Sequence, residues 1–225
     1  MKFETDPCTI EKIGYKKGKV KEPLLVCGKD KALKCGEEFK VFNYGFYRKT
    51  EKEIKIGYLY PRNSYDLMKA VVNGIYTFAK LGKYHGEKDL YTMAGLLDLD
   101  VKAMVREEYE LGDITDYKRA ANKLQKIEGI NLVIALVPDG MEDGPYNPFK
   151  TIWAKANIPS QMISMKTAKL FAEEAKEGNK AKNNSRYYLH NIILGILGKT
   201  GGIPWVVKDM PGNVDCFVGL DVATI

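Results

Sequence analysis

Hydrophobic residues along the chain recur at two spacings, one typical of strands and the other typical of helices. Every second residue is apolar or aromatic from Ile54 to Tyr60, which predicts a strand. A cap at Asn63 or Ser64 then predicts the start of a helix that ends at Gly82. Its apolar positions follow helical spacing and are expected to face the core: Leu67, Val71, Ile75 and Phe78.

Strands and helices alternate along the rest of the chain. We predict strands near residues 96–101 and at 132–137, 158–164, 203–207 and 216–222, and helices at 116–127, 148–156, 166–176 and 186–198. The helix at 116–127 is expected to bury Tyr117, Ala121, Leu124 and Ile127. The apolar run from Leu132 to Val137 is typical of a strand buried on both faces of a parallel sheet.

This alternation predicts an α/β fold with a central, mostly parallel sheet flanked by helices. Ligands of such folds bind beyond the carboxyl ends of the strands, where the loop 138–145 lies. Residues 1–52 are different, because their short apolar pieces predict short strands and loops without a core of their own.

The composition is that of a folded protein with a modest surplus of positive charge. The chain has 225 residues, 45% of them hydrophobic, and 35 Lys and Arg against 29 Asp and Glu give a formal charge of +6. Such a surplus favours polyanions such as nucleic acid, although a solvated surface rich in Lys and Glu explains it equally well. The sequence has no apolar run long enough to span a membrane and no secretory core at its start, so we expect a cytoplasmic protein.

The four cysteines do not have the spacing of a zinc site. Cys27 and Cys35 flank a short Lys-rich loop, but cysteines two to four residues apart are not found there. A reduced pair or a local disulfide is the simpler interpretation.

Asn147 and Pro148 predict the start of a helix that follows the loop 138–145. The free N–H groups and positive dipole of a helix start attract anions. Lys150, in the predicted first turn, adds a positive charge that an anion would balance. Gln161, at an end of the next strand, could donate its amide to a phosphate oxygen, although most Gln side chains are merely solvated.

Asn191, Gly195 and Lys199 are spaced so that they share one face of an otherwise apolar helix. A lysine that ends a helix before a glycine cap is the simplest explanation of Lys199. The Lys199-Thr200 pair also invites comparison with a nucleotide-binding P-loop. That motif requires glycine where Ile193 stands, and it lies before a helix rather than at the end of one.

These segments together resemble the MID domain of prokaryotic, archaeal-like Argonaute proteins. In that family a Tyr, a Lys four residues later, a Gln after a short strand and a Lys before a Gly-Gly pair bind the 5′ phosphate of a guide strand. The matching residues are Tyr146, Lys150, Gln161 and Lys199, and Asn191 matches a residue that contacts the third guide phosphate. The resemblance implies that Tyr146 also stacks on the first base.

The resemblance also implies a division into domains. Residues 1–52 are similar to the linker before MID, 53–200 to a Rossmann-like MID domain, and 201–225 to the first strands of PIWI, in which Asp221 matches the first catalytic acid. Gly195 stands where the family often has a second cation or amide, and the segment from Gln161 to Lys199 is longer than in the family because of a polar insertion at 177–185.

The function implied is binding of the 5′-phosphorylated end of a single-stranded guide DNA or RNA, without cleavage by this chain. The expected partners are that guide strand and the rest of an Argonaute chain, and the expected cofactor is a divalent cation, Mg or Mn, at the phosphate. No membrane partner is expected. Two alternatives remain, namely an enzyme that binds a phosphorylated metabolite or nucleotide and a sheet domain that serves only protein contacts.

Overall fold

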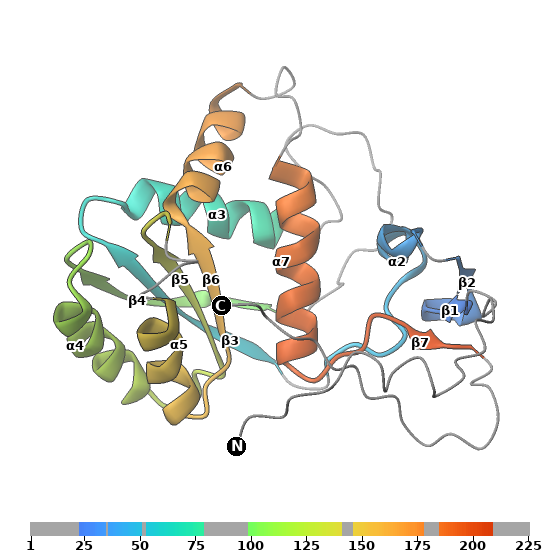
Figure 1. Cartoon of the computed structure of the whole chain (residues 1–225), viewed down its shortest axis with the longest axis horizontal. Coiled ribbons are helices and arrows are strands. Elements are labelled where there is room, and N and C mark those ends of the chain that lie inside the picture. The colour runs from blue at the N-terminus through green and yellow to red at the C-terminus, as the bar shows by residue number, and fades with distance from the viewer. Residues whose placement is uncertain are drawn as a thin grey trace, which may run out of the picture.

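A four-stranded parallel sheet forms the centre of the protein (Figure 1). The computed structural model describes residues 23–34, 36–50, 53–78, 99–140, 146–177 and 185–208. The strands are β3 (Ile54–Pro61), β4 (Leu99–Tyr109), β5 (Leu132–Val137) and β6 (Ser160–Ser164), in the order β4-β3-β5-β6. Each of the three pairings is parallel, which confirms the predicted α/β fold.

Helices cover both faces of this sheet. They are α3 (Tyr65–Tyr76), α4 (Ile114–Gln125), α5 (Tyr146–Lys155), α6 (Met165–Glu177) and α7 (Ser185–Lys199). Strand β5 is buried along its whole length because its side chains alternate between two cores. Leu132, Ile134 and Leu136 join a core with α3, α6 and α7, whereas Val133, Ala135 and Val137 join one with α4 and α5.

A second, small sheet lies beside α7 and is antiparallel. Its strands are β1 (Leu25–Val26), β2 (Ala32–Leu33) and β7 (Val206–Val207), in the order β2-β1-β7 (Figure 1). Short helices η1 (Gly28–Asp30), η2 (Glu38–Lys40) and α2 (Val41–Tyr44) complete this part. Its buried Leu33, Val41 and Phe42 belong to the same core as α3 and α7, so it packs against that core and has no separate core among the described residues.

Several predicted boundaries differ from the structure. Helix α5 begins at Tyr146, so Asn147 lies inside the helix and is not its N-cap. The prediction failed because proline is tolerated throughout the first turn, where N–H groups have no helical partner. Helix α3 ends at Tyr76, and the predicted end at Gly82 lies outside the described residues.

Other differences concern α4 and the last strands. Helix α4 begins at Ile114 because Asp113 caps it and accepts hydrogen bonds from the backbone N–H groups of Thr115 and Asp116. Ile127, predicted to be buried, follows the helix and is 38% exposed. The strand predicted at 203–207 is reduced to β7 and a single bridge between Arg48 and Ile203.

Two further predictions are not tested by the residues that the structure describes. The strand predicted at 216–222 lies outside the described residues, and the domain boundaries stay a prediction.

Among the helices that the structure describes, none combines the length and the apolar character needed to cross a bilayer.

His190 on α7 is buried among aromatic rings, with 3% of its surface exposed. Its ring stacks on Phe42, with the centroids 4.6 Å apart and the planes 18° from parallel, and it also contacts Phe78. Burial, helped by the charge of Arg186, lowers the pKa of His190 to about 4. The imidazole is therefore neutral in the folded protein at neutral pH.

We expect acid to destabilise the protein through His190. The unfolded chain binds a proton at this residue near pH 6.5 and the folded chain only near pH 4, so stability falls as the pH is lowered through this interval. Between about pH 7 and pH 5 the loss is about 2 kcal/mol. Denaturant unfolding measures the free energy of unfolding at pH 7 and at pH 5. The difference between the two values should be smaller for His190→Leu than for the unmodified protein, and an equal difference would contradict this assignment.

Candidate functional site

Strand β6 forms one edge of the large sheet, and its side chains alternate between two layers of helices. Ile163 belongs to the core under α7, and Met162 packs against the core under α4 and α5. The same alternation directs Ser160 toward α5 and Gln161 toward α7. The first two residues of this strand therefore face opposite sides of the sheet.

Lys150 reaches this edge strand from α5. Its Nζ donates hydrogen bonds to the carbonyl oxygen of Ser160, at 2.5 Å, and to the Ser160 hydroxyl, at 3.2 Å. The lysine is half-buried, and loss of hydration lowers its pKa. Ser160 is itself buried, so the ammonium group is held close to the strand.

Lys199 reaches the strand from the other side and is the last residue of α7. The helix ends there because Gly201 has a positive φ of 88° and the N–H of Gly202 bonds to the carbonyl of Leu197 at 2.9 Å. A Cβ on Gly202 would lie 2.2 Å from a Leu197 methyl carbon, so only glycine fits. The hydroxyl of Thr50 bonds to the Thr200 carbonyl at 2.9 Å and ties this helix end to the preceding segment.

The side chains of Lys199 and Gln161 meet directly. Nζ of Lys199 donates a hydrogen bond to Oε1 of Gln161, and Nε2 of Gln161 donates to the Met162 carbonyl at 3.2 Å. A Cβ on Gly195 would lie 2.9 Å from Oε1 of Gln161 and 3.7 Å from Nζ of Lys199. A side chain at Gly195 would therefore intrude on this contact, which explains why glycine fits at this position.

Lys150 affects the pKa of Lys199 although the two residues are far apart in the chain. The pKa of Lys199 falls to about 8, mainly because neighbouring groups remove part of its hydration and also because Lys150 repels its charge. The Lys199 residue as a whole remains solvent-exposed, so its crowded ammonium group is still accessible to a ligand. Two ammonium groups therefore lie at the start of β6, and the amide of Gln161 is bonded to one of them. This arrangement could attract an anion, and we call Lys150, Gln161 and Lys199 the edge cluster.

Of the five predicted binding residues, the structure brings together Lys150, Gln161 and Lys199. The other two, Asn191 and Tyr146, lie on the same helices as the two lysines. Asn191 is exposed on α7, eight residues before Lys199, which is about 12 Å along a helix. Tyr146 is the first residue of α5, but its side chain lies outside the described residues, as does all of Asp221. The structure also reveals two supporting residues, Ser160 and Thr50, which the sequence does not single out.

The position of the edge cluster differs from the one expected for the fold. Sheets of this class bind ligands beyond the carboxyl ends of their strands, but Ser160 and Gln161 are the first residues of β6. Lys150 lies in the second turn of α5 rather than the first. The cluster depends on the exposed edge of β6 and on side chains from two layers, which no single sequence motif specifies.

The described residues contain no group of three or more His, Cys, Asp or Glu that could hold a metal ion. Cys27 is a buried free thiol whose pKa is raised by burial, and Cys35 lies outside the described residues. The two ammonium groups of the edge cluster repel cations, so a divalent ion there would need ligand oxygens from a bound phosphate.

Comparison with solved structures shows a close relative. The structure of Clostridium butyricum Argonaute bound to a guide DNA (5′ deoxycytidine) and a 19-mer target DNA matches with a TM-score of 0.75 and 41% identity. That match covers 91% of this chain and 27% of that chain. The Argonaute of Aquifex aeolicus (strain VF5) is 32% identical over 108 residues, which are 45% of this chain and 14% of that protein. The chain is homologous to a segment of the prokaryotic Argonautes.

A further match supports the fold alone. An Aquifex aeolicus Argonaute structure with externally bound siRNA has a TM-score of 0.60 at 20% identity, covering 88% of this chain and 26% of that one. This chain thus spans about a quarter of the length of the Argonautes whose structures it matches. No protein-family model matches the sequence.

We expect Lys150→Gln to raise the pKa of Lys199 from about 8, because a nearby positive charge is removed. The pKa should stay below the ordinary lysine value of about 10.4, since loss of hydration is the larger cause. An NMR titration of the Lys199 side chain measures this shift. Lys155→Gln, on the same helix, should leave the pKa unchanged, and an equal response to both variants would contradict the pairing.

Proposed function

We propose that this chain binds the 5′-phosphorylated end of a guide nucleic acid strand. The observation that carries the proposal is the edge cluster, in which Lys150 and Lys199 approach one strand from opposite faces with Gln161 beside them. Homology to Argonautes supports it, since the Clostridium butyricum relative holds a guide DNA. The guide strand would then be the main partner of this chain, together with the rest of an Argonaute protein.

A terminal phosphate matches the edge cluster better than an internal one does. It carries between 1.5 and 2 negative charges near neutral pH and three free oxygens, roughly enough to balance two ammonium groups. Lysine suits such a ligand because its ammonium acts as a compact charge with three donors. The amide of Gln161 can add a hydrogen bond to the same group.

Two further residues extend the proposed contact. Asn191 would bind a phosphate further along the guide, since it is exposed on α7 on the same side as Gly195 and Lys199. The ring of Tyr146, one helical turn before Lys150, would stack on the first base. Stacking of this kind contributes about 1–3 kcal/mol and tolerates any base.

We also propose that the chain binds its guide without cutting it. The one residue that matches a catalytic acid of the family is Asp221, and cleavage would need further acids. A divalent cation, Mg or Mn, would serve binding instead, by offsetting the negative charge of the guide phosphates.

Lys199→Ala should weaken binding of a 5′-phosphorylated oligonucleotide by about tenfold to a hundredfold, because a hydrogen bond to a charged group contributes about 1.5–3 kcal/mol. The 5′-hydroxyl form of the same oligonucleotide should lose much less affinity. Fluorescence anisotropy titrations measure both, with Lys69→Ala on the exposed side of α3 as the matched control. Oligonucleotide recovered afterwards should be intact.

Equal losses for the two forms would show a general basic surface and refute terminal-phosphate binding. A nucleoside monophosphate included in the same series tests the alternative of a metabolite site. If the monophosphate binds more tightly than the 5′-phosphorylated oligonucleotide, the guide-binding proposal is wrong.

Affinity for the 5′ phosphate should fall as the pH rises above about 8. Lys199 loses its proton there in the free protein, whereas the phosphate, with a second pKa of about 6, keeps its charge. Each further pH unit should weaken binding by up to about tenfold, until the ordinary lysine range is reached. Lys199→Arg, which stays charged, should remove this decline, and a parallel decline in both proteins would contradict the role of Lys199.

A further inference from the structure

A cavity lies on the other side of α5 from Lys150, between α5 and α4. Its volume is about 600 Å³, within the usual range for small-molecule sites. Five polar side chains line it: Lys118, Asn122 and Gln125 from α4, and Thr151 and Lys155 from α5. We call this cavity the α4–α5 cleft.

The charge of the α4–α5 cleft is positive, because its lining includes two lysines and no acid. Other cations on α4 are neutralised, since Arg119 pairs with Asp116 at 2.6 Å and Lys123 pairs with Glu107 at 3.1 Å. Lys118 and Lys155 have no ion-pair partner in the part of the chain that the structure describes. Their charges are thus available to an anionic ligand.

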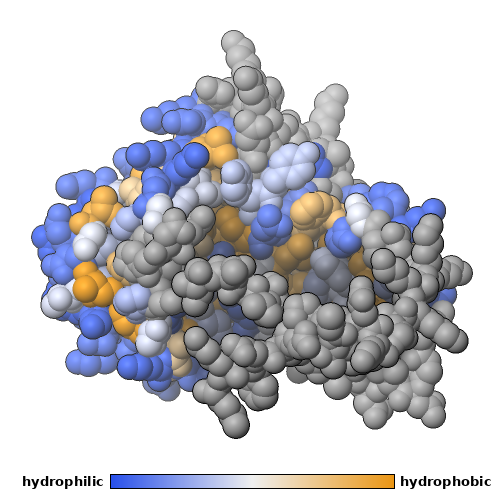
Figure 2. Space-filling model, in the orientation of Figure 1, coloured by the Kyte–Doolittle hydropathy of each residue, from blue (hydrophilic) through white to orange (hydrophobic). Residues whose placement is uncertain are grey.

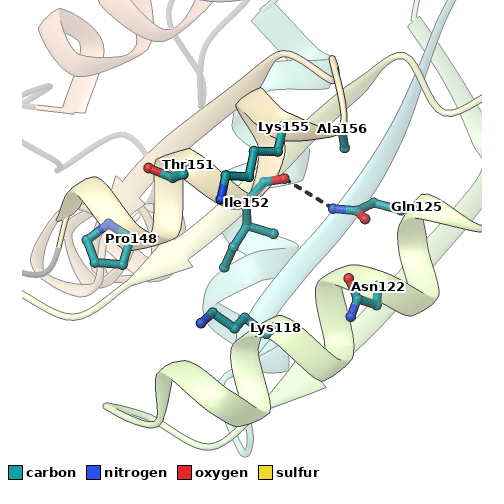
Figure 3. A pocket seen from close by; sticks show the side chains of 8 residues that line it. All are labelled: Lys118, Asn122, Gln125, Pro148, Thr151, Ile152, Lys155 and Ala156. Atoms are coloured by element: carbon teal, nitrogen blue, oxygen red, sulfur yellow. Dashed lines mark hydrogen bonds between the residues drawn. The ribbon is translucent and has the colours of Figure 1, made fainter.

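The cleft also has an apolar floor and two amides. Figure 3 shows Lys155 and Lys118 extending toward the same side of the cavity, with Ile152 between them. Nε2 of Gln125 donates a hydrogen bond to the Ile152 carbonyl at 3.4 Å, which joins the two helices and leaves the amide oxygen available as an acceptor. Figure 2 shows that exposed apolar residues lie among hydrophilic ones on the side where α4 is found.

We propose that the α4–α5 cleft binds a phosphorylated nucleoside. The phosphate lies between Lys118 and Lys155, and the base rests on Ile152 with its polar edge toward Asn122 and Gln125. Two ammonium groups suit a phosphate, and an amide can both donate and accept, as the edge of a base requires. The ligand is either a free mononucleotide or one internal nucleotide of a strand, and the site is separate from the edge cluster.

The test uses the whole chain carrying Lys199→Ala, which weakens the edge cluster. Cytidine 5′-monophosphate and a 5′-hydroxyl oligocytidine are the two probes, titrated by calorimetry. Adding Lys118→Gln and Lys155→Gln should weaken binding of at least one probe by about tenfold. The control pair Lys69→Gln and Lys176→Gln removes the same charge from exposed positions on α3 and α6 and should have little effect.

The probe that responds identifies the source of the ligand. If the monophosphate responds, the cleft takes a free nucleotide; if only the oligocytidine responds, it takes a unit within a strand. NMR signals of the Gln125 side-chain amide should shift with the responding probe. Equal affinities in the test and control pairs, or no binding of either probe, would overturn the proposal.

The experiments can distinguish failure of the α4–α5 cleft proposal from failure of the proposed binding of a guide end. In a chain with Lys199 intact, preference for a 5′-phosphoryl over a 5′-hydroxyl end should survive Lys118→Gln with Lys155→Gln. That preference depends on the edge cluster alone, so its loss in these variants would show that the two sites are one and would also overturn the proposal.

Discussion

Partial dehydration of two ammonium groups held beside one strand is the constraint on which this site depends. Lys150 and Lys199 are both partly dehydrated, and this loss of hydration, together with the smaller effect of repulsion by Lys150, lowers the pKa of Lys199 to about 8. Such an arrangement costs free energy in the folded protein, because each group would be better solvated alone. The protein tolerates it because each ammonium also donates a hydrogen bond to β6 or to a side chain that β6 carries.

The fold brings Lys150 and Lys199 to the same strand through the edge strand β6 and the C-terminal end of α7. Strand β6 presents consecutive residues to opposite faces, so lysines from two different helical layers can approach it. The glycine pair after Lys199 fixes where α7 ends, and Thr50 holds the same helix end from the N-terminal side. The small antiparallel sheet and its neighbours therefore contribute to the position of Lys199, although they lie outside the predicted MID region.

The sequence was sufficient to predict a parallel sheet and its core strand β5, because hydrophobic spacing reports burial directly, although most of β4 (Leu99–Tyr109) lies beyond the strand predicted near residues 96–101. It also selected Lys150, Gln161 and Lys199, through their resemblance to a family rather than through physical necessity. Helix starts were less predictable, since Pro148 is compatible with several positions in a first turn. The location of the edge cluster at the start of β6 depends on packing between segments that are distant in the chain. The local spacing of hydrophobic residues does not report such packing.

The hydrogen bonds that the edge cluster already makes reduce the net free energy that a ligand gains by binding there. Lys150, Lys199 and Gln161 each have an internal partner, so an incoming group must replace contacts that already exist. A terminal phosphoryl group brings enough charge and enough oxygens to do so. A carboxylate or an internal phosphodiester has a single charge and gains less from the exchange. If the edge cluster binds a strand end as proposed, its selectivity arises from the contacts that the three side chains already make in the free protein.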